Sequence, residues 1–240
     1  MKEILNLQIP SLPEATIKTD NLVSSEQSLE IAKLYAEVFR GSPWNEAVKC
    51  DTCEQFQGSE IQIESNCDCG GIFKEAYPPL ETSDYIQKDS QKPGFRIITA
   101  ESKGKLIAFS WSYLTTPIEL AISKWSTPEF QAIVVDTLKQ QGLDANTQFR
   151  YLNETGVNSE YRNLGLASRL RTKSTGPEIT VARTNSNSPM TVINYTQNFD
   201  QIMGPKMFFD RQLRTIFPTG EIANCLDQEN PSRVLFIKKI

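Results

Sequence analysis

Hydrophobic positions along the chain change between the spacing of helices and the spacing of strands. From Ser28 to Arg40 the apolar residues recur at mostly helical intervals, with Ser28 as the expected N-cap and Gly41-Ser42-Pro43 as the end. Further amphipathic helices are expected over 81–92, closed by Pro93-Gly94, and over 128–141, where proline stands at the helix entry. These three segments are the longest helical patterns in the chain.

Strand-like runs lie before, between and after these helices. Residues 95–101 and 105–114 predict a hairpin joined at 102–104. Other strands are expected over 4–9, 147–155, 178–183, 208–216 and 233–240, with short helices over 166–172 and 189–195. This alternation favours a mixed α/β sheet with helices on both faces, antiparallel in its front half, in a single domain spanning 1–240.

Residues 46–79 interrupt this pattern as a cysteine-rich insert. Cys50 and Cys53 are separated by two residues, and Cys67 and Cys69 by one. Two turns that each offer two sulfurs can enclose a tetrahedral Zn²⁺, and four thiolates would leave it no open position for catalysis. The insert has few apolar residues, so a structural zinc would order it. A redox-active dithiol or free thiols in a loose loop are the alternatives.

Composition restricts the class of protein. Hydrophobic residues make up 39% and charged residues 22%, as in an ordinary globular protein. The net charge of −4 argues against a nucleic-acid partner. It therefore also argues against a small zinc-ribbon protein that binds nucleic acid. No apolar run approaches membrane-spanning length, and the N-terminal residues do not resemble a secretory signal. We therefore expect a cytoplasmic protein without a membrane partner.

The chain contains no histidine. This absence removes the Ser-His-Asp and Cys-His mechanisms and every metal site that depends on histidine. Proton transfer must then use a carboxylate, tyrosine, cysteine, lysine, a chain terminus or water.

The stretch 151–173 carries the clearest chemical signal. It reads as a strand, a glycine-containing turn and a basic helix. Such a turn presents backbone N–H groups and the positive end of a helix dipole, which suit a phosphate or pyrophosphate. The stretch has neither the three small positions of a dinucleotide fingerprint nor the G-K-[ST] ending of a nucleoside-triphosphate loop.

Val157 followed by Arg162-x-x-Gly165-x-Ala167 resembles the acyl-CoA-binding motif of the GNAT superfamily of N-acyltransferases, Q/R-x-x-G-x-G/A. The segment 183–187 resembles the passage before that family's fourth helix. The resemblance implies a GNAT-like mixed, largely antiparallel central sheet flanked by helices and splayed at the cofactor-binding strand, with acetyl-CoA as cosubstrate. The cofactor-binding residues that it implies are Val157, Arg162, Asn163, Leu164, Gly165, Leu166, Ala167 and Asn187. A G-x-A after arginine also occurs by chance, and Gly165 would then only begin a helix packed on a strand.

The same resemblance implies direct attack of an amine on the thioester, with a backbone N–H near Val157 supporting the oxyanion. Glu154 is the expected base, and its alternative role is a salt-bridged surface glutamate. The family's tyrosine general acid falls by count on Asn194, so Tyr195, one residue later, is the catalytic candidate.

Trp44 and Glu46 are the expected acceptor-site residues, and Glu119 is a lesser candidate. The sequence thus predicts an N-acyltransferase, monomeric or homodimeric, acting on a small-molecule or protein amine. A free amino acid, a polyamine, an aminoglycoside and a protein terminus all remain open as acceptors. The alternative is a non-catalytic protein with an acyl-CoA fold, whose zinc insert docks a partner.

Overall fold

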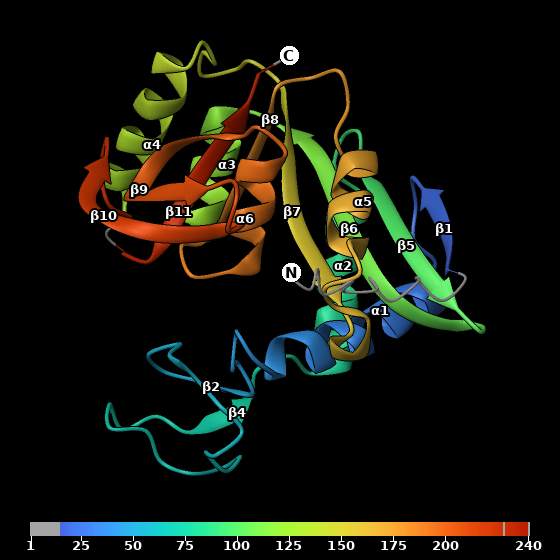
Figure 1. Ribbon diagram of the computed structural model, residues 1–240. Coiled ribbons are helices and arrows are strands. Elements are labelled where there is room, and N and C mark those ends of the chain that lie inside the picture. The colour runs from blue at the N-terminus through green and yellow to red at the C-terminus, as the bar shows by residue number, and fades with distance from the viewer. Residues whose placement is uncertain (1–14, 228, 240) are drawn as a thin grey trace, which may run out of the picture.

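The computed structural model describes residues 15–227 and 229–239. An eight-stranded sheet forms its centre (Figure 1), and neighbouring strands are antiparallel except for one parallel pair, β7 and β8. In spatial order the strands are β1 (Ala15–Asp20), β5 (Arg96–Ser102), β6 (Lys105–Thr115), β7 (Phe149–Val157), β8 (Thr180–Asn185), β11 (Arg233–Lys238), β9 (Asp200–Asp210) and β10 (Thr215–Ala223).

The parallel pair separates after only three residues. Arg150 to Leu152 of β7 pair with Thr180 to Ala182 of β8, and β7 then continues to Val157 paired with β6 only. A bulge against β6 falls within β7 at Asn153, because Trp111 pairs with Glu154 whereas Ser112 pairs with Leu152. The mixed, largely antiparallel sheet splayed at this strand confirms the predicted fold class.

Helices cover both faces of the sheet. The larger core lies under α1 (Ser25–Arg40), α2 (Pro79–Ser90), α3 (Pro117–Lys124) and α4 (Pro128–Gln140), where Trp111 and Trp125 are fully buried. A smaller core on the other face lies under α5 (Leu166–Ser174), and a third lies beside α6 (Pro189–Thr196). No described helix combines the length and the hydropathy that crossing a membrane requires.

Several predicted boundaries were wrong. The first helix begins at Ser25, because the Ser24 side chain accepts the N–H of Gln27 at 3.1 Å; Ser28 lies inside the helix and its hydroxyl meets that of Ser83 at 2.8 Å. The expected single strand over 208–216 is instead the end of β9, a turn over 211–214 and the start of β10; the Asp210 carboxylate accepts two backbone N–H groups of this turn. The expected strand over 4–9 lies outside the described residues, and β1 and α3 were not predicted.

The cysteine-rich insert folds as a separate small sheet. Its strands are β2 (Val48–Cys50), β3 (Phe56–Gln57) and β4 (Phe73–Glu75), with β2 in the middle. Val48, Cys50, Cys67 and Phe73 form its own core, apart from the three cores of the main domain. Figure 1 shows the insert projecting beyond the end of α1, away from the central sheet.

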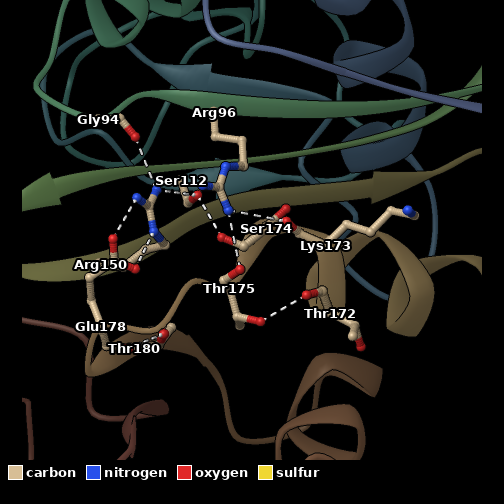
Figure 2. Close-up of polar contacts among 10 residues, drawn as sticks. All are labelled: Gly94, Arg96, Ser112, Arg150, Thr172, Lys173, Ser174, Thr175, Glu178 and Thr180. Carbon is tan, nitrogen blue, oxygen red and sulfur yellow. Dashed lines mark hydrogen bonds and ion pairs between the residues drawn. The ribbon is translucent and has the colours of Figure 1, made fainter. Parts of the chain in front are cut away.

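Arg96 contacts the C-terminal end of α5 directly, and Arg150 does so through the Ser112 hydroxyl, which donates to the Ser174 carbonyl at 3.0 Å (Figure 2). Arg96 donates to the carbonyl oxygens of Lys173 and Thr175, at 3.4 and 3.2 Å. Arg150 is 3% exposed and joins the Gly94 carbonyl, the Ser112 hydroxyl and the Glu178 carboxylate. Cations at a helix C-terminus satisfy its unpaired carbonyls and complement its dipole. These contacts anchor the C-terminal end of α5 to β5 and β6.

Candidate active site

A cleft of about 500 Å³ opens where β7 and β8 separate. One wall is the end of β7 and the turn into α5, and the other wall is the start of α6. The predicted cofactor residues that line it are Val157, Arg162, Asn163, Gly165, Leu166 and Ala167. Ser168, Ser188, Pro189 and Arg214 also line it and were not predicted. Leu164 and the exposed Asn187 belong to the same two turns but do not line the cleft.

The turn into α5 presents a row of unpaired backbone N–H groups. Within the described residues, the N–H groups of residues 163–168 donate to no protein acceptor, whereas Arg169 N–H closes the first helical bond, to Gly165 at 3.1 Å. Asn163 and Gly165 have φ values of 63° and 75°, which turn successive N–H groups toward one side. A Cβ built on Gly165 would meet nothing within 4 Å, so this position opens onto free space. The geometry is that of an anion cradle at a helix N-terminus.

Arg162 was expected to bind the cofactor, but its side chain contacts main-chain carbonyls instead. Its guanidinium donates to three main-chain carbonyls, those of Val157 at 3.1 Å, Val38 at 3.3 Å and Ser42. Arg162 therefore ties the end of α1 to the turn and complements the dipole of α1. It supports the cradle as a brace rather than as a free cation.

The edge of β7 that faces the cleft carries two more donors. Asn158 N–H donates to Ile107 at 2.9 Å, which makes these two residues a hydrogen-bonded pair across β6 and β7. Because such pairs alternate along an antiparallel ladder, the N–H groups of Thr155 and Val157 point away from β6. Since β8 has already diverged, both donors face the cleft.

A second, smaller cavity of about 130 Å³ adjoins the cleft. Trp44, Thr155 and Met190 line both spaces, so the cavity and the cleft meet beside the free edge of β7. The predicted Glu154, Trp44 and Glu46 all line the smaller cavity. The structure thus brings together the expected base and the expected acceptor-site residues.

Glu154 is a half-buried carboxylate whose side chain has no hydrogen-bond partner among the described residues. Burial raises its pKa from 4.5 to about 7, against the opposing charges of Lys124 and Arg233. A carboxylate with this pKa can accept a proton near neutral pH. Its environment fits a general base better than a surface salt bridge.

Glu46 lines the same cavity and accepts a hydrogen bond from the Tyr77 hydroxyl. Burial raises the pKa of Glu46, and this hydrogen bond opposes the rise. Residues 46 and 77 stand where the insert leaves the main domain and returns to it. Tyr77 packs against Tyr35 and Phe39, and Trp44 also packs against Phe39. The base of the insert therefore forms one wall of the smaller cavity.

Two expected roles do not fit the structure. Tyr195 lines neither space, because its ring packs on Phe209 and Phe236 and its hydroxyl bonds Gln201 at 2.7 Å and Met207 at 3.0 Å. Glu119 closes a capping box with Thr116 at the start of α3 and lines neither space.

A polar network that the sequence did not predict adjoins the smaller cavity, which Asn153 and Lys124 help to line. Asn153, the bulged residue of β7, donates to Asp89 at 2.7 Å and to the Tyr85 hydroxyl at 2.6 Å, and it accepts from Lys124 at 2.8 Å. Asp89 is 1% exposed and also accepts the Trp111 indole N–H at 3.0 Å. The network centres on the bulged residue, and nothing in the local sequence marks a bulge.

The four cysteines of the insert meet as predicted. All their sulfurs lie within 4.8 Å of one another; Cys50 and Cys69 are 3.5 Å apart, and Cys53 and Cys67 are 3.7 Å apart. Thiolates about 2.3 Å from a tetrahedral zinc would stand roughly 3.8 Å apart, so this cluster fits that metal. These separations are far too long for disulfides.

Comparison with known proteins gave likenesses among solved structures only. No protein-family model and no curated protein sequence matches the chain. A Drosophila melanogaster polyamine N-acetyltransferase that forms N-acetylagmatine matches at 9% identity and a TM-score of 0.49, over 95% of this chain and 100% of that one. A mosquito arylalkylamine N-acetyltransferase-like protein matches at 11% identity and a TM-score of 0.47, over 94% of this chain and 100% of that one. A putative acetyltransferase from Salmonella typhimurium, solved with its cofactor acetyl-CoA, matches at 9% identity and a TM-score of 0.44, over 93% of this chain and 91% of that one.

At such identities and scores these likenesses add no argument about activity. The chain's own features are the strand order of its sheet, the single parallel pair that splays apart, and the R-x-x-G-x-A turn with its row of free N–H groups. By these features the protein has the fold of the GNAT superfamily of acyl-CoA N-acyltransferases.

Proposed function

We propose that this protein transfers an acetyl or another acyl group from acyl-CoA to an amine. The observation that carries the proposal is the row of unpaired N–H groups at residues 163–168, which opens directly onto the free edge of a splayed strand. The pyrophosphate of CoA would bind these N–H groups at the positive end of α5. The acyl arm would then lie along β7, toward the point where the cleft meets the smaller cavity.

The reaction follows from what stands at that point. The thioester oxygen would accept a hydrogen bond from Thr155 or Val157 N–H, and either donor would stabilise the negative charge that develops on the oxygen. The acceptor amine would enter from the smaller cavity. Glu154 would take its proton directly or through a water, because its pKa of about 7 suits that transfer near neutral pH.

The amine lone pair then forms the C–N bond and the thioester oxygen takes the charge. When the carbonyl reforms, the C–S bond breaks and CoA leaves as a thiolate. The attacking nitrogen releases its remaining extra proton, which the thiolate takes up directly or through solvent, while Glu154 returns its proton to solvent. With Tyr195 packed away from both spaces and Asn194 at the position expected for the family's acid, this scheme uses no tyrosine. Glu154 is thus the one side chain to which we assign proton transfer.

Calorimetric titration with acetyl-CoA tests the binding half of the proposal. Ala167 is the second residue of α5 and lines the cleft. An aspartate there favours the helix dipole, so Ala167→Asp should fold, but it places a negative charge against the pyrophosphate. At 5–6 Å and an effective dielectric of 20, two unit charges repel by about 3 kcal/mol, or roughly a hundredfold in affinity. Leu80 holds the same position in α2 and is 73% exposed, so Leu80→Asp is the matched control.

Steady-state assays with a panel of amines test the catalytic half. Glu154→Gln should lower kcat/KM by about 10²- to 10⁴-fold while acetyl-CoA affinity stays within a factor of about two. A protein that binds acyl-CoA without catalysis would bind in the calorimeter, transfer nothing to any amine, and show no response to this substitution. Equal acetyl-CoA affinity of wild type and Ala167→Asp would refute the binding site itself.

A further inference from the structure

The side chains that line the smaller cavity include more cations than carboxylates, a balance that direct attack by an amine does not explain. Four cations line it, namely Lys124, Arg171, Arg183 and Arg233, against two carboxylates, Glu46 and Glu154. An amine acceptor is itself a cation in water at neutral pH. A cavity built only to attract amines would carry the opposite balance of charge.

Two of these cations have described partners of their own. Arg183 forms an ion pair with Asp227, which is fully buried and also accepts the Trp125 indole N–H at 2.9 Å. Lys124 donates to Asn153 at 2.8 Å. Both side chains are therefore held by the protein, and only the Nε of Arg183 is left buried without a hydrogen-bond partner in the described part of the chain.

Arg171 and Arg233 have no carboxylate partner among the described residues. Arg171 is 5% exposed; one guanidinium nitrogen donates to Asn194, while its Nε is buried without a hydrogen-bond partner. Burial lowers the pKa of Arg171 to about 10, so it stays charged at neutral pH. A buried guanidinium with an unsatisfied N–H lacks an acceptor that a bound ligand can supply.

Arg233 stands at the start of β11, and its side chain makes no hydrogen bond or ion pair with a described residue. Leu235 pairs with Arg183 across β11 and β8, so Arg233 and Arg183 are diagonal neighbours on one face. Asp227 neutralises Arg183, and Arg233 attracts Glu154 and Glu46 without a hydrogen bond or ion pair to either. Arg233 therefore keeps N–H groups that the anionic group of a ligand can bind.

We propose that the acceptor is a small amino acid-like amine, whose anionic group binds Arg233 and Arg171 while its amine faces Glu154. This inference rests on the proposed acyl transfer and narrows its substrate class. Arginine N–H groups match the geometry of a carboxylate or phosphate. The cavity volume of about 130 Å³ is close to that of cavities that admit a benzene-sized molecule, so it suits a short skeleton. Polyamines and aminoglycosides carry only positive charge and would be repelled.

The test compares pairs of acceptors that differ only in the anionic group. Acetyl transfer is measured for amino acids of increasing length, each beside its carboxamide, with aminoalkyl phosphates and spermidine as further arms. We expect kcat/KM for the preferred amino acid to exceed that for its amide by roughly a hundredfold. Preference for the aminoalkyl phosphate would identify phosphate as the anion. Equal or better use of the amide or of spermidine would overturn the inference.

Variants separate substrate binding from an indirect effect of Arg233 on Glu154. Arg233→Gln should reduce the amino acid/amide ratio at least tenfold, chiefly through KM. Lys238→Gln removes a half-buried cation from the same strand outside the cavity and should leave the ratio unchanged. If Arg233→Gln instead slows both acceptors equally and moves the pH profile, Arg233 only tunes the base and the inference fails.

Failure of the proposed function would look different from failure of this inference. If no amine of the panel is acetylated while acetyl-CoA still binds, the protein is not an acyltransferase for these acceptors and the substrate class fails with it. If transfer occurs without preference for an anionic group, acyl transfer stands and the acceptor class is wrong.

Discussion

Replacing the proposed base should stabilise the protein while it lowers kcat/KM. Glu154 sits where burial disfavours its charged form, and the attraction of Lys124 and Arg233 does not fully offset this. Raising a carboxyl pKa from 4.5 to about 7 corresponds to about 3 kcal/mol, at 1.36 kcal/mol for each tenfold change in proton affinity. Glutamine has nearly the same shape and carries no charge to desolvate.

The sign of the effect depends on pH. The folded protein holds the Glu154 proton more tightly than the unfolded chain, so wild type bears no penalty below pH 4.5. The penalty grows as pH rises and is complete above about pH 7. Glu154→Gln should therefore match wild type near pH 4.5 and exceed it by about 3 kcal/mol at pH 8. For a chain of this size that difference raises Tm by roughly 6–12 °C.

Urea unfolding of both proteins between pH 4.5 and 8.5 measures this difference. In parallel, wild-type kcat/KM should fall about tenfold for each pH unit below 7, because the base becomes protonated. A Glu154→Gln protein that is less stable than wild type at pH 8 would show that the carboxylate is held by favourable partners. A stability difference that does not change with pH would refute the pKa argument.

Two further substitutions test the elements around the site. Arg162→Gln removes three contacts to main-chain carbonyls, so it should lower the unfolding free energy by about 2–3 kcal/mol and weaken acetyl-CoA binding. The control Arg40→Gln, in an exposed ion pair, should change the unfolding free energy by less than about 1 kcal/mol. Equal effects of the two substitutions would contradict the role of Arg162 as a brace. Cys53→Ser should lower zinc, measured by mass spectrometry after anaerobic purification, from about one equivalent to less than half. Glu46 and Tyr77 stand at the two ends of the insert and line the smaller cavity, so metal loss should also raise the KM for the amine more than the KM for acetyl-CoA. A wild-type protein without zinc would refute the metal site.

The sequence was most informative where a local pattern determines local geometry. The R-x-x-G-x-A turn gave the start of α5 and the cleft wall because positive φ at Asn163 and Gly165 is a property of the turn itself. The cysteine spacing likewise gave the four-sulfur cluster. In both cases residues close in sequence form the feature, so the spacing alone was enough.

The rest of the site depends on contacts between distant segments. The sequence predicts Arg162 as a phosphate ligand, but the end of α1 packs against it, and its guanidinium N–H groups donate to carbonyls there. Tyr195 lies one helical position from Asn194, and that rotation of about 100° turns its ring toward the β9 side. Arg233 comes from a strand 79 residues beyond Glu154 and carries no motif. Such residues become candidates only when the sheet brings them together.

The central claim is that the unpaired N–H groups at the start of α5 bind the pyrophosphate of acyl-CoA. Calorimetric titration of wild type, Ala167→Asp and Leu80→Asp with acetyl-CoA tests it most directly. The account predicts binding by wild type and Leu80→Asp with similar affinity, and roughly hundredfold weaker binding by a folded Ala167→Asp. Binding of equal strength by all three proteins, or by none of them, would contradict it.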